Sequence, residues 1–139
     1  MIVNTAYPYM KQKTAHPTAL WTDGKVNFPY TTSGSCYFDS ANNQFVMPDA
    51  SSVIFSDVDL RTFETITLEY ATDNTTFGTY TLQAVLPNGT TIDLLIGTTN
   101  QKKGSQSKNI PATAKNDIVK LKLGAGAKTF RITNVSWSK

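Results

Sequence analysis

A chain of 139 residues is long enough for one domain around a single core, and we expect residues 1–139 to form one. Charged residues make up 17% of the chain, below the share of about 25% in ordinary soluble domains. Threonine, serine and asparagine take their place, as in secreted β-sandwiches rather than cytoplasmic enzymes. The net charge of +3 is spread too thinly for a nucleic-acid-binding surface, and no apolar run approaches the ~20 residues of a membrane helix.

The first 34 residues contain prolines and little regular alternation, so no strand is predicted there. The only histidine, His16, precedes Pro17 in this irregular part. The only cysteine, Cys36, follows in the apolar-leaning run 35–38 and has no partner for an internal disulfide. We expect a buried thiol.

Strand patterns begin with two short apolar runs, at residues 45–47 and 52–55. Residues 65–70 then alternate between apolar and polar side chains, which predicts that Leu68 faces the core and Glu69 the solvent.

Two consecutive hairpins are predicted next. Residues 80–86 and 90–96 both alternate, and the turn 87–89 between them ends in a glycine, which accepts the positive φ of a tight turn. Residues 73–78 have similar turn chemistry and make the preceding connection.

The polar segment 97–115 contains several lysines and serines and a proline, so it is predicted to be a long connection between sheets. Alternation resumes at residues 118–123, breaks at 124–126 and returns in a last strand at 129–137. Trp137 follows Val135 at a period of two and is assigned to the core.

These short strands with a long crossover predict an all-β fold, an antiparallel β-sandwich of jelly-roll type. The residues that share the inward phase form the predicted core: Ile66, Leu68, Tyr70, Leu82, Ala84, Ile92, Leu94, Leu121, Leu123, Phe130 and Ile132.

The chain is poorly supplied for catalysis. A triad or a histidine-based zinc site would depend on His16 alone, and most of the ten carboxylates lie in turns or at strand ends, where capping is their ordinary role. Asp57 and Asp59 lie on the same side of a short extended segment, where two carboxylates suit a hard cation. A solvated strand end is the favoured interpretation of that pair.

Aromatic residues are the informative class, because sugar rings stack their C–H faces on flat π surfaces while their hydroxyls pair with polar side chains. Aromatic side chains crowd the first forty residues. Polar, loop-like neighbours leave both a core and a surface position open for Trp21 and Tyr30, whereas phenylalanines in a small sandwich ordinarily fill the core.

The stretch 56–68, the hairpins after it and the ending 130–137 resemble the β-sandwich carbohydrate-binding modules of bacterial glycoside hydrolases. The resemblance covers roughly residues 50–139 and is nearest to families 4 and 22, carried by xylanases and glucanases of Bacteroidota. It implies a ligand cleft lined by aromatic and polar side chains. Carried over by position, the ligand-binding residues are Trp21, Tyr30, Tyr37, Glu69, Gln83 and Arg131, with Trp21 the strongest candidate.

The resemblance further implies a non-catalytic module that binds plant cell-wall polysaccharide, xylan first and β-glucan next, and targets a covalently linked hydrolase. Such a protein is secreted or lies at the bacterial cell surface, needs no cofactor, and engages neither nucleic acid nor membrane. Many such modules hold a structural calcium, which stays open because the sequence shows no clear liganding motif. The alternatives are an immunoglobulin-like interaction or adhesin domain and a small carboxylate-based hydrolase or lyase.

Overall fold

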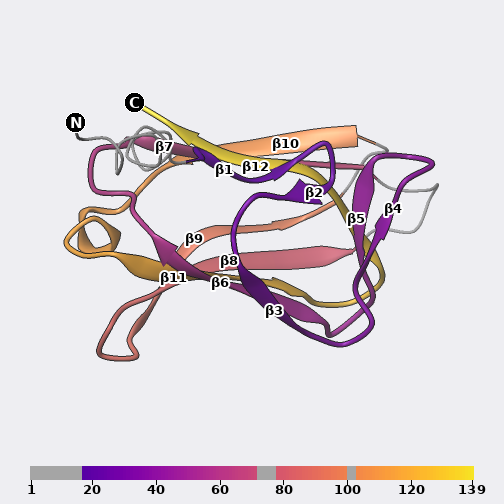
Figure 1. Cartoon of the computed structure of the whole chain (residues 1–139), viewed down its shortest axis with the longest axis horizontal. Helices are drawn as coiled ribbons and strands as arrows, with labels where there is room; N and C mark the ends of the chain where they lie inside the picture. Colours follow the sequence, from indigo (N-terminus) through magenta and orange to yellow (C-terminus); the bar gives the residue numbers. More distant parts are fainter. Residues whose placement is uncertain (1–16, 72–77, 100–102) are drawn as a thin grey trace, which may run out of the picture.

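The computed structural model describes residues 17–71, 78–99 and 103–139, and these form two antiparallel β-sheets packed face to face (Figure 1). The predicted all-β sandwich is therefore confirmed. None of the described residues belongs to a helix long and apolar enough to cross a membrane.

The seven-stranded sheet has the order β10-β7-β12-β1-β2, with β5 also paired to β12 and β4 paired to β5. Its strands are β1 (Ala19–Thr22), β2 (Lys25–Val26), β4 (Tyr37–Asp39), β5 (Gln44–Met47), β7 (Thr65–Ala71), β10 (Lys103–Asn109) and β12 (Phe130–Ser138).

The five-stranded sheet has the order β3-β6-β11-β8-β9. Its strands are β3 (Tyr30–Ser33), β6 (Ser52–Val58), β8 (Thr79–Val85), β9 (Thr91–Thr98) and β11 (Val119–Ala125), and a short 3-10 helix, η1 (Ala112–Ala114), precedes β11. In Figure 1 this sheet lies below the other, and β4 and β5 stand at the right-hand end of the sandwich.

The predicted register is confirmed. In β7 the side chain of Leu68 is buried and that of Glu69 is exposed, as alternation requires when one face of a strand covers the core. Ten of the eleven predicted core residues are buried, and Ile92 is half-buried against the same core. Trp137 is also buried, as predicted.

The hairpin between β8 and β9 is confirmed in detail. Leu86 donates its backbone N–H to the Thr90 carbonyl at 2.8 Å, and Gly89 adopts a φ of +91°. This left-handed conformation is one that glycine adopts without steric cost. The other predicted hairpin is wrong, because β7 belongs to the seven-stranded sheet and β8 to the five-stranded sheet. The connection at residues 73–78 therefore crosses between the sheets, and it lies largely outside the described residues.

Two predictions about irregular segments are wrong. Residues 103–109 form β10, which pairs with β7 along its whole length. Its inward positions carry Gly104 and Gln106, so the strand shows no apolar alternation, and backbone pairing holds it instead. Strands β1, β2 and β3 likewise fall within the first 34 residues, where their two to four residues are too short to produce a period.

Candidate functional site

Trp21 belongs to the core, so its prediction as a surface platform is wrong. Its side chain is fully buried, with its ring centroid 5.3 Å from that of Phe45 and 4.8 Å from that of Phe55. The pairing of β1 with β12 is irregular between Ala19 and Trp21, and Leu20 and Trp21 are both buried there. Trp21 Nε1 is buried without a hydrogen-bond partner among the described residues.

A groove of about 400 Å³ opens at one edge of the sandwich, where β3 of one sheet faces β2 and β4 of the other. We call it the aromatic groove. Its lining includes Lys25, Val26, Tyr30, Tyr37, Phe38 and Phe45. Tyr30 and Tyr37, two of the predicted ligand-binding residues, are thus brought together from different sheets.

The aromatic groove gathers the exposed rings of the described part of the chain. Tyr37 is 53% exposed, Tyr30 is 43% exposed and Phe38 is 37% exposed, while the other aromatic side chains of residues 17–71, 78–99 and 103–139 are buried or half-buried. The ring of Tyr30 packs against the core, because its centroid lies 6.0 Å from that of the buried Phe55. Open aromatic faces on a rigid sheet edge are suited to stacking against a flat, partly apolar ligand.

Lys25 reaches the groove because the β1–β2 turn packs closely against the β4–β5 loop. Gly24 has a φ of +79°, and a Cβ there would lie 2.7 Å from the backbone carbonyl carbon of Asn43. Only glycine permits this approach. Lys25 Nζ lies 6.0 Å from the centroid of the Phe38 ring, within range of a cation–π contact.

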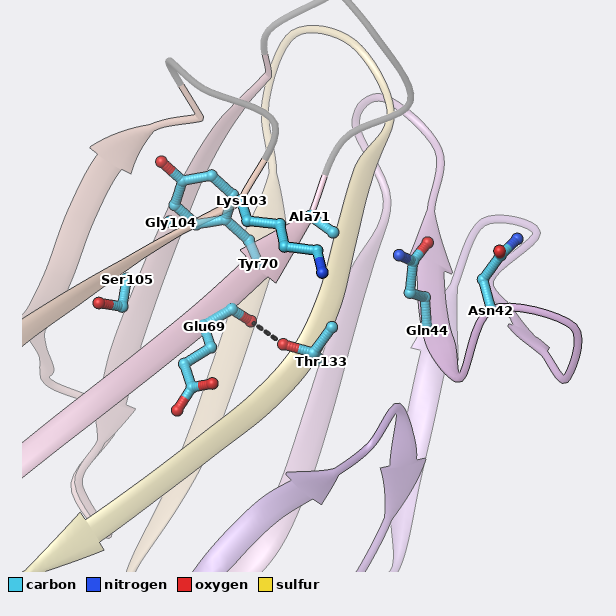
Figure 2. A pocket seen from close by; sticks show the side chains of 9 residues that line it. All are labelled: Asn42, Gln44, Glu69, Tyr70, Ala71, Lys103, Gly104, Ser105 and Thr133. Carbon is cyan, nitrogen blue, oxygen red and sulfur yellow. Dashed lines mark hydrogen bonds between the residues drawn. The ribbon is translucent and has the colours of Figure 1, made fainter.

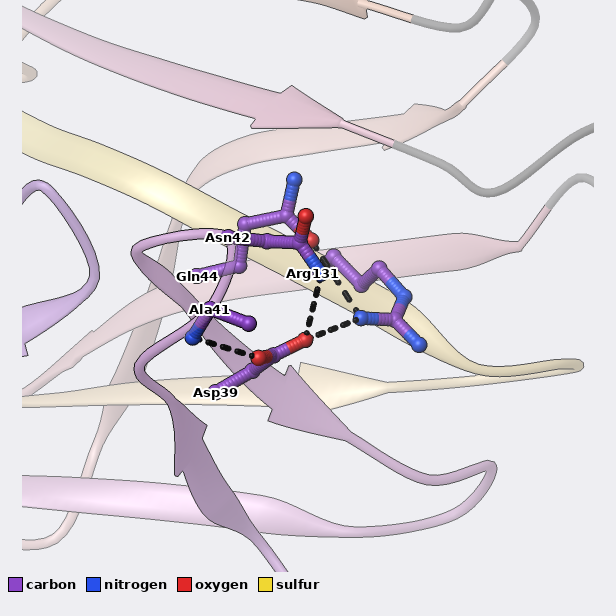
Figure 3. Close-up of polar contacts among 5 residues, drawn as sticks. All are labelled: Asp39, Ala41, Asn42, Gln44 and Arg131. Atoms are coloured by element: carbon purple, nitrogen blue, oxygen red, sulfur yellow. Dashed lines mark hydrogen bonds and ion pairs between the residues drawn. The ribbon is translucent and has the colours of Figure 1, made fainter.

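A polar network fixes the hairpin that carries Tyr37 and Phe38. Arg131 Nη1 donates to Asp39 Oδ2 at 3.3 Å and to Gln44 Oε1 at 3.2 Å (Figure 3). Asp39 also accepts from Asn42 Nδ2 at 2.8 Å and from the Ala41 N–H at 3.0 Å. The hydrogen bond from Asn42, with smaller contributions from backbone N–H groups and Arg131, lowers the pKa of Asp39. Arg131 therefore joins β12 to the β4–β5 hairpin and positions the groove instead of lining it.

A second depression, of about 460 Å³, lies on the outer face of the seven-stranded sheet and contains Glu69, Gln44, Lys103 and Thr133 (Figure 2). We call it the polar groove. Thr133 Oγ1 donates to the Glu69 carbonyl at 3.1 Å, and Asn134 Nδ2 donates to Glu69 Oε1 at 3.4 Å. The aromatic residue in its lining, Tyr70, is buried, so the described residues here offer hydrogen-bonding groups but no open stacking surface.

Gln83 is separate from the other predicted residues. It lies on β8 of the five-stranded sheet, where its Nε2 donates to Asp93 Oδ1 at 2.8 Å, whereas Glu69 belongs to the opposite sheet. The six predicted residues therefore do not form one cleft.

Sequence reasoning missed Lys25 and Phe38 in the aromatic groove. Phe38 directly follows Tyr37 in a strand of only three residues, which is too short for alternation to show that both side chains are exposed. Cys36 also lines the groove and is half-buried rather than buried.

Asp57 and Asp59 line the same depression, of about 620 Å³. Arg61 engages both oxygens of Asp59, through Nε and Nη2 at 2.9 Å each, while Asp57 sits in a left-handed conformation with a φ of +62°. Among residues 17–71, 78–99 and 103–139, no cluster of three or more His, Cys, Asp or Glu side chains is arranged to hold a metal ion. His16 lies outside the described residues.

No protein-family model matches the sequence, and no curated protein matches it. Solved structures do match. The family 6 carbohydrate-binding module CsCBM6-3 from Clostridium stercorarium, in complex with cellobiose, superposes with a TM-score of 0.56 at 15% identity, over 81% of this chain and 94% of that one. The fold is similar to that of family 6 carbohydrate-binding modules.

Two further matches extend this result. The C-terminal family 6 module of LamC, a marine laminarinase from Zobellia galactanivorans, has a TM-score of 0.50 at 14% identity and covers 78% of this chain and 91% of that one. PfGH50B has a TM-score of 0.63 at 12% identity, but the match spans 81% of this chain and only 22% of PfGH50B. At these identities the likeness is one of fold, and the predicted kinship with families 4 and 22 stays a prediction.

Proposed function

We propose that this chain is a non-catalytic carbohydrate-binding module whose site is the aromatic groove. The observation that carries the proposal is the gathering of the exposed rings of Tyr30, Tyr37 and Phe38 around one groove. A polysaccharide in water already has its hydroxyls satisfied, so net affinity must come substantially from apolar ring faces that leave water on stacking. A sandwich that binds proteins would instead use a flat apolar patch or an uncharged strand edge, whereas the edge strand β10 carries Lys103 and Lys108.

The ligand proposed is a plant cell-wall polysaccharide, xylan first and β-glucan next. The cellobiose bound by CsCBM6-3 supports a β-linked glycan, because a module of similar fold holds one. The polar network behind the groove supports binding there, since it holds the hairpin of Tyr37 and Phe38 in position and so lowers the entropic cost of ordering the site.

We further propose that the module works as part of a larger secreted or cell-surface bacterial protein, next to a glycoside hydrolase. PfGH50B supports this, because the matching fold occupies only 22% of that longer chain. Binding would raise the local concentration of the attached enzyme at its polysaccharide through tethering alone.

Affinity gel electrophoresis with xylan, mixed-linkage β-glucan and mannan, together with a cellulose pull-down, tests the proposal. We expect at least one polysaccharide to retard the protein, and the Tyr37→Ala variant to lose that retardation. Ile96→Ala is the matched control, because Ile96 has the same exposed fraction of 53% and lies on β9, away from the groove. Equal behaviour of the two variants, or no retardation by any polysaccharide, would contradict the proposal.

A further inference from the structure

We infer that the aromatic groove selects acidic glycans, in which a sugar carries a carboxylate or a sulfate ester. The inference rests on the proposed function and names the ligand class for the same site. The feature that carries it is Lys25, the one charged residue among the described residues that line the groove.

The charge of Lys25 is not neutralised within the described part of the chain. The ion pairs there join Arg61 to Asp59, Lys115 to Glu64 and Arg131 to Asp39, and none includes Lys25. Its contact is the face of Phe38, at 6.0 Å. A cation–π contact attracts an ammonium group without occupying its three hydrogen-bond donors, which stay available to a ligand.

The carboxylates of Asp39 and Asp23 do not compensate the charge of Lys25. Asp39 follows Phe38 in β4, but its two oxygens already accept hydrogen bonds from Ala41, Asn42 and Arg131. Asp23 precedes Gly24 and is exposed, and it does not line the groove.

The placement of Lys25 also decides which rings are open. Because the ammonium group lies over Phe38, the rings of Tyr30 and Tyr37 are the free platforms for a sugar. A neutral sugar stacked there would gain only a hydrogen bond from Lys25. A sugar with an anionic substituent would gain a charge-assisted bond to a cation that forms no ion pair with the described residues.

Isothermal titration with three xylo-oligosaccharides of equal length tests the inference: one unsubstituted, one bearing glucuronic acid and one bearing a sulfate ester. We expect the acidic probes to bind about five- to tenfold more tightly than the neutral one at low salt. The preference should fall between about 0.01 M and about 1 M salt, as the Debye length shrinks from about 30 Å to about 3 Å. The two acidic arms tell a carboxylate preference from a sulfate preference.

Three variants separate Lys25 from the overall positive charge. Lys25→Gln should lower the affinity for the acidic probes about five- to tenfold and so remove the preference. The affinity for the neutral probe should fall less, because a neutral sugar loses only a hydrogen bond. Lys25→Arg should retain the preference. Lys108→Gln, which removes an exposed lysine on β10, should leave the preference unchanged. The inference is overturned if the parent binds all three probes with equal affinity, or if Lys108→Gln reduces the preference for acidic probes as much as Lys25→Gln does. Tyr37-dependent binding of the neutral probe in that case leaves the proposed function standing. Failure of all three probes overturns the inference and xylan as the ligand, and retardation by β-glucan, mannan or cellulose then decides the proposed function.

Discussion

Tyr80 stands opposite Gly97 in the β8–β9 pair, and its phenol group fills the space that a side chain at residue 97 would need. A Cβ on Gly97 would lie 2.5 Å from the Tyr80 hydroxyl oxygen and 2.7 Å from the ring carbon that bears it. The hydroxyl donates to Gln106 Oε1 at 2.7 Å, so β8, β9 and β10 meet at this point.

We therefore expect Gly97→Ala to destabilise the fold by about 1–3 kcal/mol, the usual cost of forcing extra atoms into a packed site. Gly124→Ala is the matched control, because Gly124 also lies in a strand and a Cβ added there would meet no atom within 4 Å. That substitution should be neutral or stabilise by about 0.4–1 kcal/mol. Urea unfolding of both variants measures the difference, and equal stabilities would contradict the packing described.

Burial raises the pKa of Tyr80 to about 12, with a smaller contribution from Tyr70. The phenol stays neutral in the folded chain while the unfolded chain ionises from about pH 10, so its contribution to stability is present below pH 10 and lost as the pH rises towards 12. In Tyr80→Phe this loss should be absent. Unfolding free energies of parent and variant between about pH 9 and pH 12 test it, and parallel curves would show that Tyr80 does not titrate in this way.

Trp21→Ala should lower stability by about 3–5 kcal/mol, as truncation of a large buried ring does. Trp21→Phe keeps a ring in contact range of Phe45 and removes an indole N–H that has no partner among the described residues. We expect this variant to bind glycan as the parent does. Melting curves and glycan titrations on the two variants distinguish a core role of Trp21 from a ligand-binding role. A large loss of affinity in a well-folded Trp21→Phe variant would show that Trp21 contributes to the binding site.

Asp39→Asn should weaken glycan binding although Asp39 lines neither groove, because the network with Arg131 holds the hairpin of Tyr37 and Phe38. Asp39 should also affect folding stability, because its pKa is lower in the folded chain than its ordinary value of 3.8. The ionised carboxylate therefore stabilises the fold above pH 3.8, and this stabilisation is lost as the pH falls through the lower folded pKa. The melting temperature of the parent should thus be higher than that of Asp39→Asn at neutral pH, and the two melting temperatures should become equal in acid. Asp93→Asn, on the other sheet, serves as the control for affinity.

Alternation along the chain was sufficient to predict β7, β8, β11 and β12, because each of these strands buries one face. It gave no signal for β1, in which the consecutive residues Leu20 and Trp21 are both buried. It failed for β10, whose inward residues are a glycine beneath Tyr70 and a glutamine bonded to Tyr80. These partners come from other strands, so the residues of β10 alone give no sign of them.

The site was predicted only in part for a similar reason. Tyr30 and Tyr37 were identified from their polar neighbours, but their meeting depends on the edges of two different sheets lying side by side. Trp21 also has polar neighbours after it in the chain, but its side chain is buried. The register of β1 against β12 shifts between Ala19 and Trp21, so Leu20 and Trp21 both face the core. Local composition does not contain that irregularity.

Strand β10 ends the seven-stranded sheet and carries Lys103 and Lys108. An unpaired strand edge invites a second molecule to extend the sheet, and lysines on that edge oppose it, because two such edges would bring like charges together. Many copies crowded along one polysaccharide would then stay separate molecules and would not aggregate through their edges.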